Sequence, residues 1–151
     1  MGRVDQHLRS IGIELPDVSA PLANYVSVVL HAGTATVSGQ LSRGAHGLVT
    51  GRVGEHLSVE AGREAARLCA INLLATLRAA LDLDRVERCL LLSGFVNAPQ
   101  DFADQSTVIN GASDFLVEAL GEAGRHARTA VGVSSLPFNA AVEVAASFAI
   151  R

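Results

Sequence analysis

Two lone charges stand near the C-terminal end of the chain, in segments whose other residues are small or apolar. Arg128 begins one segment and Glu143 lies inside the next, within the stretch HARTAVGVSSLPFNAAVE at residues 126–143. A guanidinium offers two parallel N–H groups that match the oxygens of a carboxylate. A glutamate can hold or deprotonate a water molecule. The same two residues could instead pair with each other as a structural ion pair, so residue type alone leaves both interpretations open.

Other residue types exclude several chemistries. The chain has 12 arginines and no lysine, which excludes a lysine Schiff base and a P-loop lysine. The five histidines have no metal-ligand spacing, so we expect neither a metal nor another cofactor. Ser134-Ser135 lacks the setting of a nucleophile elbow, and the glycine-rich stretch 44–54 lacks that of a dinucleotide site. Cys69 and Cys89 lie in apolar surroundings and are predicted to be buried thiols.

A single domain is the simplest organisation for 151 residues of which 49% are hydrophobic and 18% charged. We expect it to span residues 1–151, with residues 1–22 as an N-terminal extension that carries a short helix at about 3–12. The net charge of −3, the scattered arginines and few aromatic residues argue against nucleic acid as the main partner. No apolar run fits a membrane span or a signal peptide, so we expect a cytoplasmic protein without a membrane partner.

Hydrophobic periodicity predicts the elements that must position the two charges. In chain order these are strands at 25–30 and 34–41, a helix at 58–81, a strand at 86–96, a helix at 101–123, and strands at 128–134 and 140–150. Ser58 is a favourable N-cap, and the segment 42–57 is predicted to be a long loop with a short strand at most. The apolar segment 86–96 predicts a central strand buried on both faces. The order β-β-α-β-α-β-β favours an α+β sandwich.

The last predicted strand has two different faces. One face, predicted to pack on the helices, consists of Val142, Val144, Phe148 and Ile150, and the other consists of Glu143, Ala145, Ser147 and Ala149. Because the second face is small and weakly polar, we expect it to meet another subunit. If the last two strands are adjacent and antiparallel, the turn at Leu136-Pro137 brings Gly132 opposite Glu143, with Arg128 on the same face.

The C-terminal segment resembles the signature of the YjgF family, also called Rid, for reactive intermediate deaminase. The residues that carry the resemblance, over about residues 23–150, are Tyr25, Ser38-Gly39-Gln40, Asp101-Phe102, Val108-Ile109-Asn110, Arg128, Leu136-Pro137 and Glu143. The chain departs from the commonest form of the family at Ala130, where a cysteine is frequent, and at Ser113, where an aromatic residue is usual. The loop at 42–57 also differs, so the resemblance indicates a divergent branch.

The resemblance implies a fold like that of the trimeric chorismate mutase, with a mixed sheet and two helices on one face. It also implies a homotrimer whose sheets form a central barrel with clefts between subunits. Members that have the arginine resemble hydrolases of enamines and imines, which release a 2-keto acid and ammonia from a small carboxylate substrate. Two alternatives remain: a trimer that binds or senses small carboxylate metabolites without turnover, and, less favoured by the charge, an endoribonuclease.

The resemblance also implies roles for individual residues. Arg128 would bind the substrate carboxylate, Glu143 would hold or deprotonate the attacking water, and Tyr25 would close over the substrate or donate a proton. The groups expected to orient the substrate are the backbone amides near Ser38 and Gly39 and the side chain of Asn110. Each has a structural alternative: Tyr25 as a core or interface residue, Asn110 as a loop contact, and Glu143 as an ion-pair partner. His126 could line the cleft, or be a solvated loop histidine.

Overall fold

A computed structural model describes residues 1–21 and 23–151 and therefore leaves out Leu22, the last residue of the predicted N-terminal extension. The helices and strands, in chain order, are α1 (Arg3–Ser10), β1 (Val28–His31), β2 (Thr34–Leu41), β3 (Arg43–Gly44), β4 (Gly47–Leu48), α2 (Val59–Ala80), β5 (Val86–Asn97), α3 (Gln105–Leu120), β6 (Ala127–Val133) and β7 (Val142–Ile150). Short 3-10 turns lie at Leu83–Arg85, Gly121–Gly124 and Pro137–Asn139. No helix in the described part of the chain could cross a membrane.

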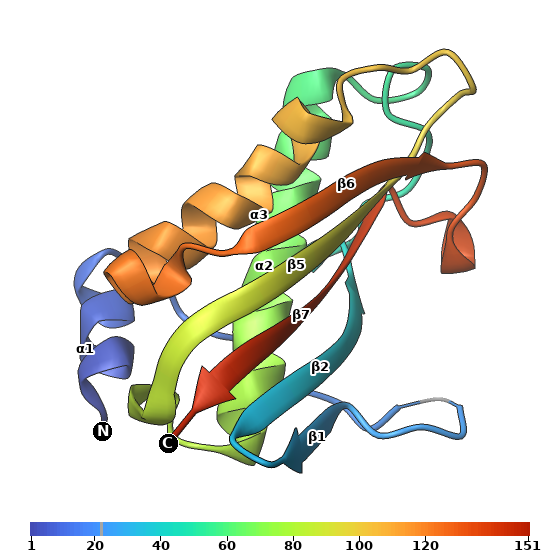
Figure 1. Cartoon of the computed structure of the whole chain (residues 1–151). Coiled ribbons are helices and arrows are strands. Elements are labelled where there is room, and N and C mark those ends of the chain that lie inside the picture. The colour runs from blue at the N-terminus through green and yellow to red at the C-terminus, as the bar shows by residue number, and fades with distance from the viewer. Residues whose placement is uncertain (22) are drawn as a thin grey trace.

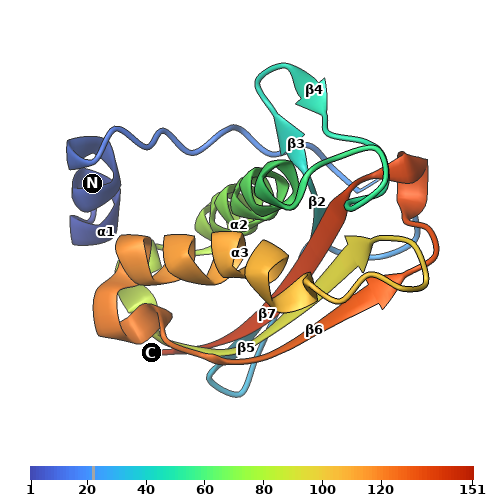
Figure 2. The same cartoon turned by 90° about the horizontal axis from the view of Figure 1, so that it is seen from above.

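Five strands form one sheet in the order β1-β2-β7-β5-β6, and β3 pairs with β4 separately. Only β5 and β6 run parallel, while the other pairs in the large sheet are antiparallel. Helices α2 and α3 cover one face of this sheet, and the described residues form no second layer on the opposite face (Figures 1 and 2). The predicted α+β architecture, with a mixed sheet and two helices on one face, is confirmed.

Local chemistry favours the beginning of α2 and the turn of the first hairpin. The hydroxyl of Ser58 accepts a hydrogen bond from the amide of Ala61 at 3.0 Å, as expected of an N-cap. In the β1–β2 hairpin, Ala32 and Gly33 both have positive φ, at 49° and 75°, which suits a tight two-residue turn. Local sequence therefore determines the limits of α2 and the register of the first hairpin.

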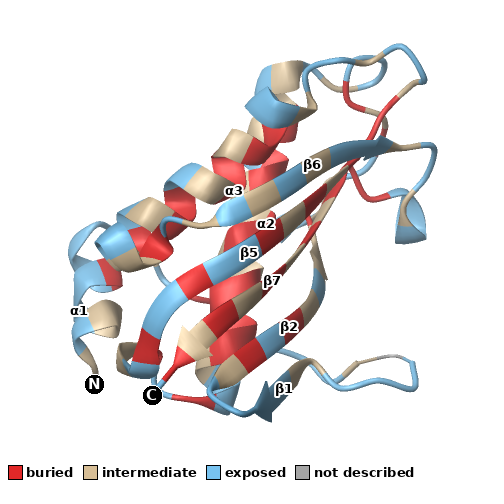
Figure 3. Cartoon of the chain, in the orientation of Figure 1, coloured by how far each residue is buried: buried red, intermediate tan, exposed pale blue. Residues whose placement is uncertain are grey.

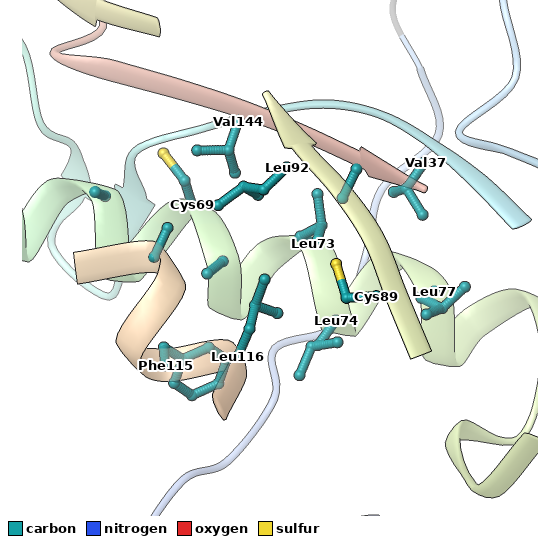
Figure 4. Packing of buried hydrophobic residues seen from close by; sticks show 14 of the residues in the cluster. Val37, Cys69, Leu73, Leu74, Leu77, Cys89, Leu92, Phe115, Leu116 and Val144 are labelled. Atoms are coloured by element: carbon teal, nitrogen blue, oxygen red, sulfur yellow. The ribbon is translucent and has the colours of Figure 1, made fainter. Parts of the chain in front are cut away.

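The hydrophobic core lies between the sheet and the helices (Figure 4). Along β7 every second residue from Val142 to Ile150 is buried and the residues between are half-buried, so the predicted alternation is confirmed. Cys69 and Cys89 are free and buried in this core, as expected. Burial, followed by the nearby charge of Glu143, raises the pKa of the Cys69 thiol, and burial raises that of Cys89 to about 12.

Three details differ from the expectations. First, β6 and β7 are not neighbours, because β5 lies between them. The chain leaves β5 through α3 and returns parallel to it, as a crossover helix on one face requires. Second, β5 is central but open on one face, with Leu91 43% exposed, because no layer formed by residues 1–21 and 23–151 covers the outer side of the sheet (Figure 3). Third, the 42–57 segment contains two short paired strands rather than one.

The N-terminal helix α1 is attached to the body through a carboxylate supplied from far along the chain. Its own N-cap, Gly2, has no side chain, and Asp84 accepts hydrogen bonds from the amides of Arg3 and Val4 at 2.8 and 2.9 Å. These two bonds lower the pKa of the Asp84 carboxyl. Asp84 therefore acts as a cap in space rather than in sequence.

Replacing Asp84 with asparagine is expected to loosen α1 and to remove a pH effect. Because the folded pKa of Asp84 is lowered, its contribution to stability is present above the unfolded value of about 3.9 and is lost as pH falls through the folded value. The amide proton shifts of Arg3 and Val4 should report this titration by NMR in the wild-type protein and lose it in Asp84→Asn. Asp101→Asn, a change at an exposed aspartate, should leave the titration intact, and a wild-type titration at or above 3.9 would contradict the prediction.

Candidate functional site

Arg128 lies at the beginning of β6 with its side chain against helix α3. Its partner in register on β5 is Leu92, which is buried beneath the helices, so Arg128 is on the helix side of the sheet. Its Nη1 donates to Asn110 Oδ1 at 2.8 Å and to Ser113 Oγ at 3.1 Å, and its Nη2 donates to the carbonyl of Ser106 at 3.1 Å. One strand and two turns of one helix thus hold the guanidinium.

Every acceptor around Arg128 is neutral. No ion pair among residues 1–21 and 23–151 includes this arginine, so its charge is not balanced by a carboxylate there. A guanidinium has five N–H donors, of which three have protein acceptors in the described structure. The other two, on the adjacent nitrogens Nε and Nη2, can reach the two oxygens of an added carboxylate. Arg128 therefore keeps two N–H groups without a protein acceptor in the described structure.

Asn110, a predicted site residue, contacts Arg128 directly. The geometry does not favour the alternative that Asn110 only contacts a loop, because its Oδ1 accepts a hydrogen bond from the Arg128 guanidinium. Its amide nitrogen has no acceptor among the described residues and can donate to a substrate. Arg128 and Asn110 therefore form one polar group between β6 and α3.

Glu143 lies on the other face of the sheet. It alternates with buried Val142 and Val144 on β7, and its partner in register on β5 is Phe95. The expectation that Arg128 and Glu143 share a face is wrong, and so is the alternative of an ion pair between them in one chain. The reason is topological: β5 separates their strands, and the two side chains project to opposite sides.

A second group of predicted residues gathers around Glu143. The β2 strand is irregular between Val37 and Gln40, so Ser38 and Gly39 lie in a bulge next to β7. A Cβ added at Gly39 would lie 2.5 Å from Glu143 Oε2, which means that the glutamate folds over this glycine. Burial raises the pKa of the Glu143 carboxyl. Glycine at position 39 therefore leaves the space that Glu143 occupies.

Ser38 and Tyr25 lie on the same side of the molecule as this bulge. The hydroxyl of Ser38 donates to the carbonyl of Val26 at 2.7 Å, and the Ser38 amide donates to the carbonyl of Ser27 at 2.9 Å. Both donors of Ser38 are therefore already used. Tyr25 precedes β1 and is 53% exposed. Its hydroxyl has no partner in the described part of the chain, so Tyr25 is not a core residue of one subunit.

The predicted site residues thus form two groups in one chain. Arg128 lies on β6 and contacts Asn110, whereas Tyr25 lies three residues before β1. The strands β6 and β1 are the two edges of the sheet (Figure 1). With strands about 4.8 Å apart, the two edge strands are separated by about 19 Å. A molecule as small as a three-carbon acid cannot touch both groups in one subunit. No group of His, Cys, Asp or Glu in residues 1–21 and 23–151 is arranged to hold a metal ion.

Two polar residues beside Arg128 were not predicted as site residues. Ser113 Oγ contacts Arg128 Nη1, and His126 Nε2 lies 2.8 Å from the same oxygen. His126 is half-buried and bonded on both ring nitrogens, so it is not the solvated loop histidine that the sequence suggested. The sequence spacing could have predicted Ser113, because Asn110 and Ser113 are three residues apart on one helix and must share a face.

Comparisons with known proteins agree with this fold. Residues 5–149 match the family model described as "YjgF/chorismate mutase-like, putative endoribonuclease". The chain is 50% identical over 146 residues to Protein TCP17 of Trypanosoma cruzi, covering 95% of this chain and 91% of that protein.

Solved structures give the same result. The protein Atu1372 of Agrobacterium tumefaciens, of unknown function, is 44% identical with a TM-score of 0.89, over 98% of this chain and 94% of that one. A structure from Shewanella oneidensis described as a "putative endoribonuclease" is 31% identical with a TM-score of 0.93, over 99% and 100%. The more distant TdcF of E. coli, solved with bound serine, is 23% identical with a TM-score of 0.61, over 87% and 91%. The chain belongs to the YjgF/chorismate mutase-like family.

Proposed function

We propose that the protein hydrolyses small 2-imino acids and their enamine tautomers to 2-keto acids and ammonia. The observation that carries the proposal is the state of Arg128, which is held by three neutral acceptors and keeps two adjacent donors for a ligand. A guanidinium without an acidic partner favours an anionic ligand, and its planar shape favours a carboxylate. The imine of a 2-keto acid has such a carboxylate next to its reactive carbon.

We further propose that the site lies between two subunits of a trimer. The outer face of the sheet exposes Leu91, Val131 and Val29, at 43%, 39% and 50%, and no layer in the described part of the chain covers it (Figure 3). An apolar sheet face of this kind favours a subunit contact. Arg128 and Asn110 of one subunit would then meet the group of Tyr25, Ser38 and Glu143 of its neighbour. Such a contact would bring together the two groups of predicted site residues that lie apart within one chain.

The proposed reaction needs no strong nucleophile. Arg128 holds the carboxylate, which fixes the C=N carbon relative to a water molecule and lowers the entropic part of the barrier. Glu143 accepts a proton as the water oxygen bonds to this carbon, and the imine nitrogen becomes an amine. When the carbinolamine collapses, the nitrogen takes the proton that Glu143 carries and the C–N bond breaks. The hydroxyl loses its proton to Glu143 or solvent as the C=O bond forms, and ammonia leaves with the keto acid. The exposed Tyr25 hydroxyl can donate to the nitrogen.

A coupled assay tests the proposal. 2-Iminopropanoate is generated in situ, and its loss is followed with the wild-type protein, with Arg128→Ala and without protein. We expect wild type alone to exceed the spontaneous rate. If wild type leaves that rate unchanged while pyruvate still binds, the deaminase proposal is wrong and the protein is a carboxylate-binding member of the family.

The raised pKa of Glu143 predicts the form of the pH profile. A general base works only when deprotonated, so kcat/KM should rise with pH through an apparent pKa above the ordinary glutamate value of about 4.3. Glu143→Gln should lose this acidic limb and lower kcat about 10²- to 10⁴-fold. Glu87→Gln, at an exposed site on β5, is the matched control. An unchanged profile in Glu143→Gln would show that the residue is structural.

A further inference from the structure

Ser113 and His126 form a hydrogen-bonded chain that ends on Arg128. Ser113 Oγ lies 3.1 Å from Arg128 Nη1 and 2.8 Å from His126 Nε2. His126 Nδ1 lies 2.6 Å from the carbonyl oxygen of Gly124. The three side chains therefore link the middle of α3, the turn that follows this helix, and the beginning of β6.

The direction of each hydrogen bond follows from the available donors. The carbonyl of Gly124 can only accept, so Nδ1 of His126 must carry a proton. A neutral imidazole has one N–H, which leaves Nε2 as an acceptor. The Ser113 hydroxyl then donates to Nε2, and its lone pairs face the N–H of Arg128. With these assignments every hydrogen bond points the same way: Arg128 donates to Ser113, Ser113 donates to His126, and His126 donates to the Gly124 carbonyl.

The hydrogen bonds of Ser113 and His126 act on Nη1 of Arg128, whereas the substrate carboxylate is proposed to bind Nε and Nη2. Ser113 and Asn110 together engage Nη1, while Ser106 engages one donor of Nη2. A hydroxyl that donates to an imidazole is a stronger acceptor, because neighbouring hydrogen bonds polarise each other. The rotation of the guanidinium about its last bonds is thus restricted, and Nε and the second Nη2 donor keep a fixed direction. Fixing them in advance reduces the entropy lost on binding.

We propose that Ser113 and His126 are positioning residues that preset Arg128 for a carboxylate ligand, an inference that rests on the proposed function for its substrate class. The competing explanation is structural, in which the pair only closes the turn between α3 and β6. The two explanations predict different effects when the pair is mutated. A positioning pair changes carboxylate affinity, whereas a purely structural pair changes only stability.

The test combines a spectroscopic and a binding measurement on the full chain. The imidazole nitrogens are observed by ¹⁵N NMR, with the His126 signals identified from a His126→Gln sample. We expect the Nδ1–H form in wild type. Pyruvate titrations should give a dissociation constant about tenfold higher for Ser113→Ala than for wild type, because the Arg128 side chain must then be ordered when the ligand binds. Ser113→Thr, which keeps the hydroxyl, should stay within about twofold.

Kinetics add a further separation. The carboxylate interacts equally with ground state and transition state, so Ser113→Ala should raise KM by the same factor and change kcat little. Thr107→Ala, at an exposed position on the same helix, is the matched control for a lost hydroxyl and should leave KM unchanged. Alanine is a good helix former, so Ser113→Ala is expected to fold.

The outcomes separate this inference from the proposed function. An Nε2–H form in wild type, or pyruvate affinity that Ser113→Ala does not change, would overturn the positioning role even if imines are hydrolysed. If the tautomer and the change in affinity are as expected but no imine is hydrolysed, the positioning role is supported and the deaminase proposal is wrong. A wild-type protein that does not bind pyruvate would overturn both.

Discussion

Arg128→Ala is expected to lower kcat/KM for 2-iminopropanoate about 10³-fold. Two charge-assisted hydrogen bonds to the carboxylate contribute about 1.5–3 kcal/mol each, and every 1.4 kcal/mol corresponds to a factor of ten. The loss would also leave Asn110 and Ser113 without the donor that now orders them. The measurement is the rate of imine loss over the spontaneous rate, at substrate concentrations well below KM.

Lysine is not expected to rescue the function. An ammonium has three donors at one point and lacks the planar fork, so it cannot hold Asn110, Ser113 and Ser106 and also bind both carboxylate oxygens. Arg128→Lys should therefore lose about 10²-fold or more. Arg125→Ala is the matched control, because Arg125 is exposed and paired with Glu122 at 3.1 Å. Equal losses in Arg125→Ala and Arg128→Ala would point to a general charge effect and contradict the anchor.

Gly111→Ala is expected to destabilise the protein by about 3 kcal/mol, the upper part of the range for overpacked cores. A Cβ at Gly111 would overlap the carbonyl oxygen of Arg63 on the facing helix. This obstacle is backbone, so α2 and α3 must separate, which opens the core around Phe115 (Figure 4). The higher helix propensity of alanine, about 1 kcal/mol, opposes the loss but is smaller.

Thermal unfolding measures the effect. For a chain of this size, 3 kcal/mol corresponds to a fall in Tm of about 6–12 °C. Thr107→Ala introduces alanine at an exposed position of the same helix and should change Tm little. A Gly111→Ala protein as stable as wild type would mean that the helices are not held at this separation. Because Gly111 follows Asn110, a shift of α3 should also weaken pyruvate binding.

The sequence by itself determined the order of the main helices and strands, the beginning of α2 and the buried face of β7. Ser58 predicted where α2 begins, because an N-cap is satisfied by a neighbour three residues away. The alternation along β7 predicted which residues meet the helices, since the strand period is two. These predictions rest on interactions within a few residues, which a linear sequence contains. The choice of Arg128 and Asn110 came from ordered motifs, and the structure brings these two residues together.

Only the tertiary structure decided which strands are neighbours and hence which charges meet. Nothing local to Leu136-Pro137 indicates that β5 separates β6 from β7, because that order depends on where α3 returns the chain. The same order sends Arg128 and Glu143 to opposite faces and leaves Arg128 unpaired by acid in the described chain. It also places Ser113 and His126, 13 residues apart, within 2.8 Å. Long-range pairing depends on the packing of the whole sheet against α2 and α3, and no short stretch of sequence contains that information.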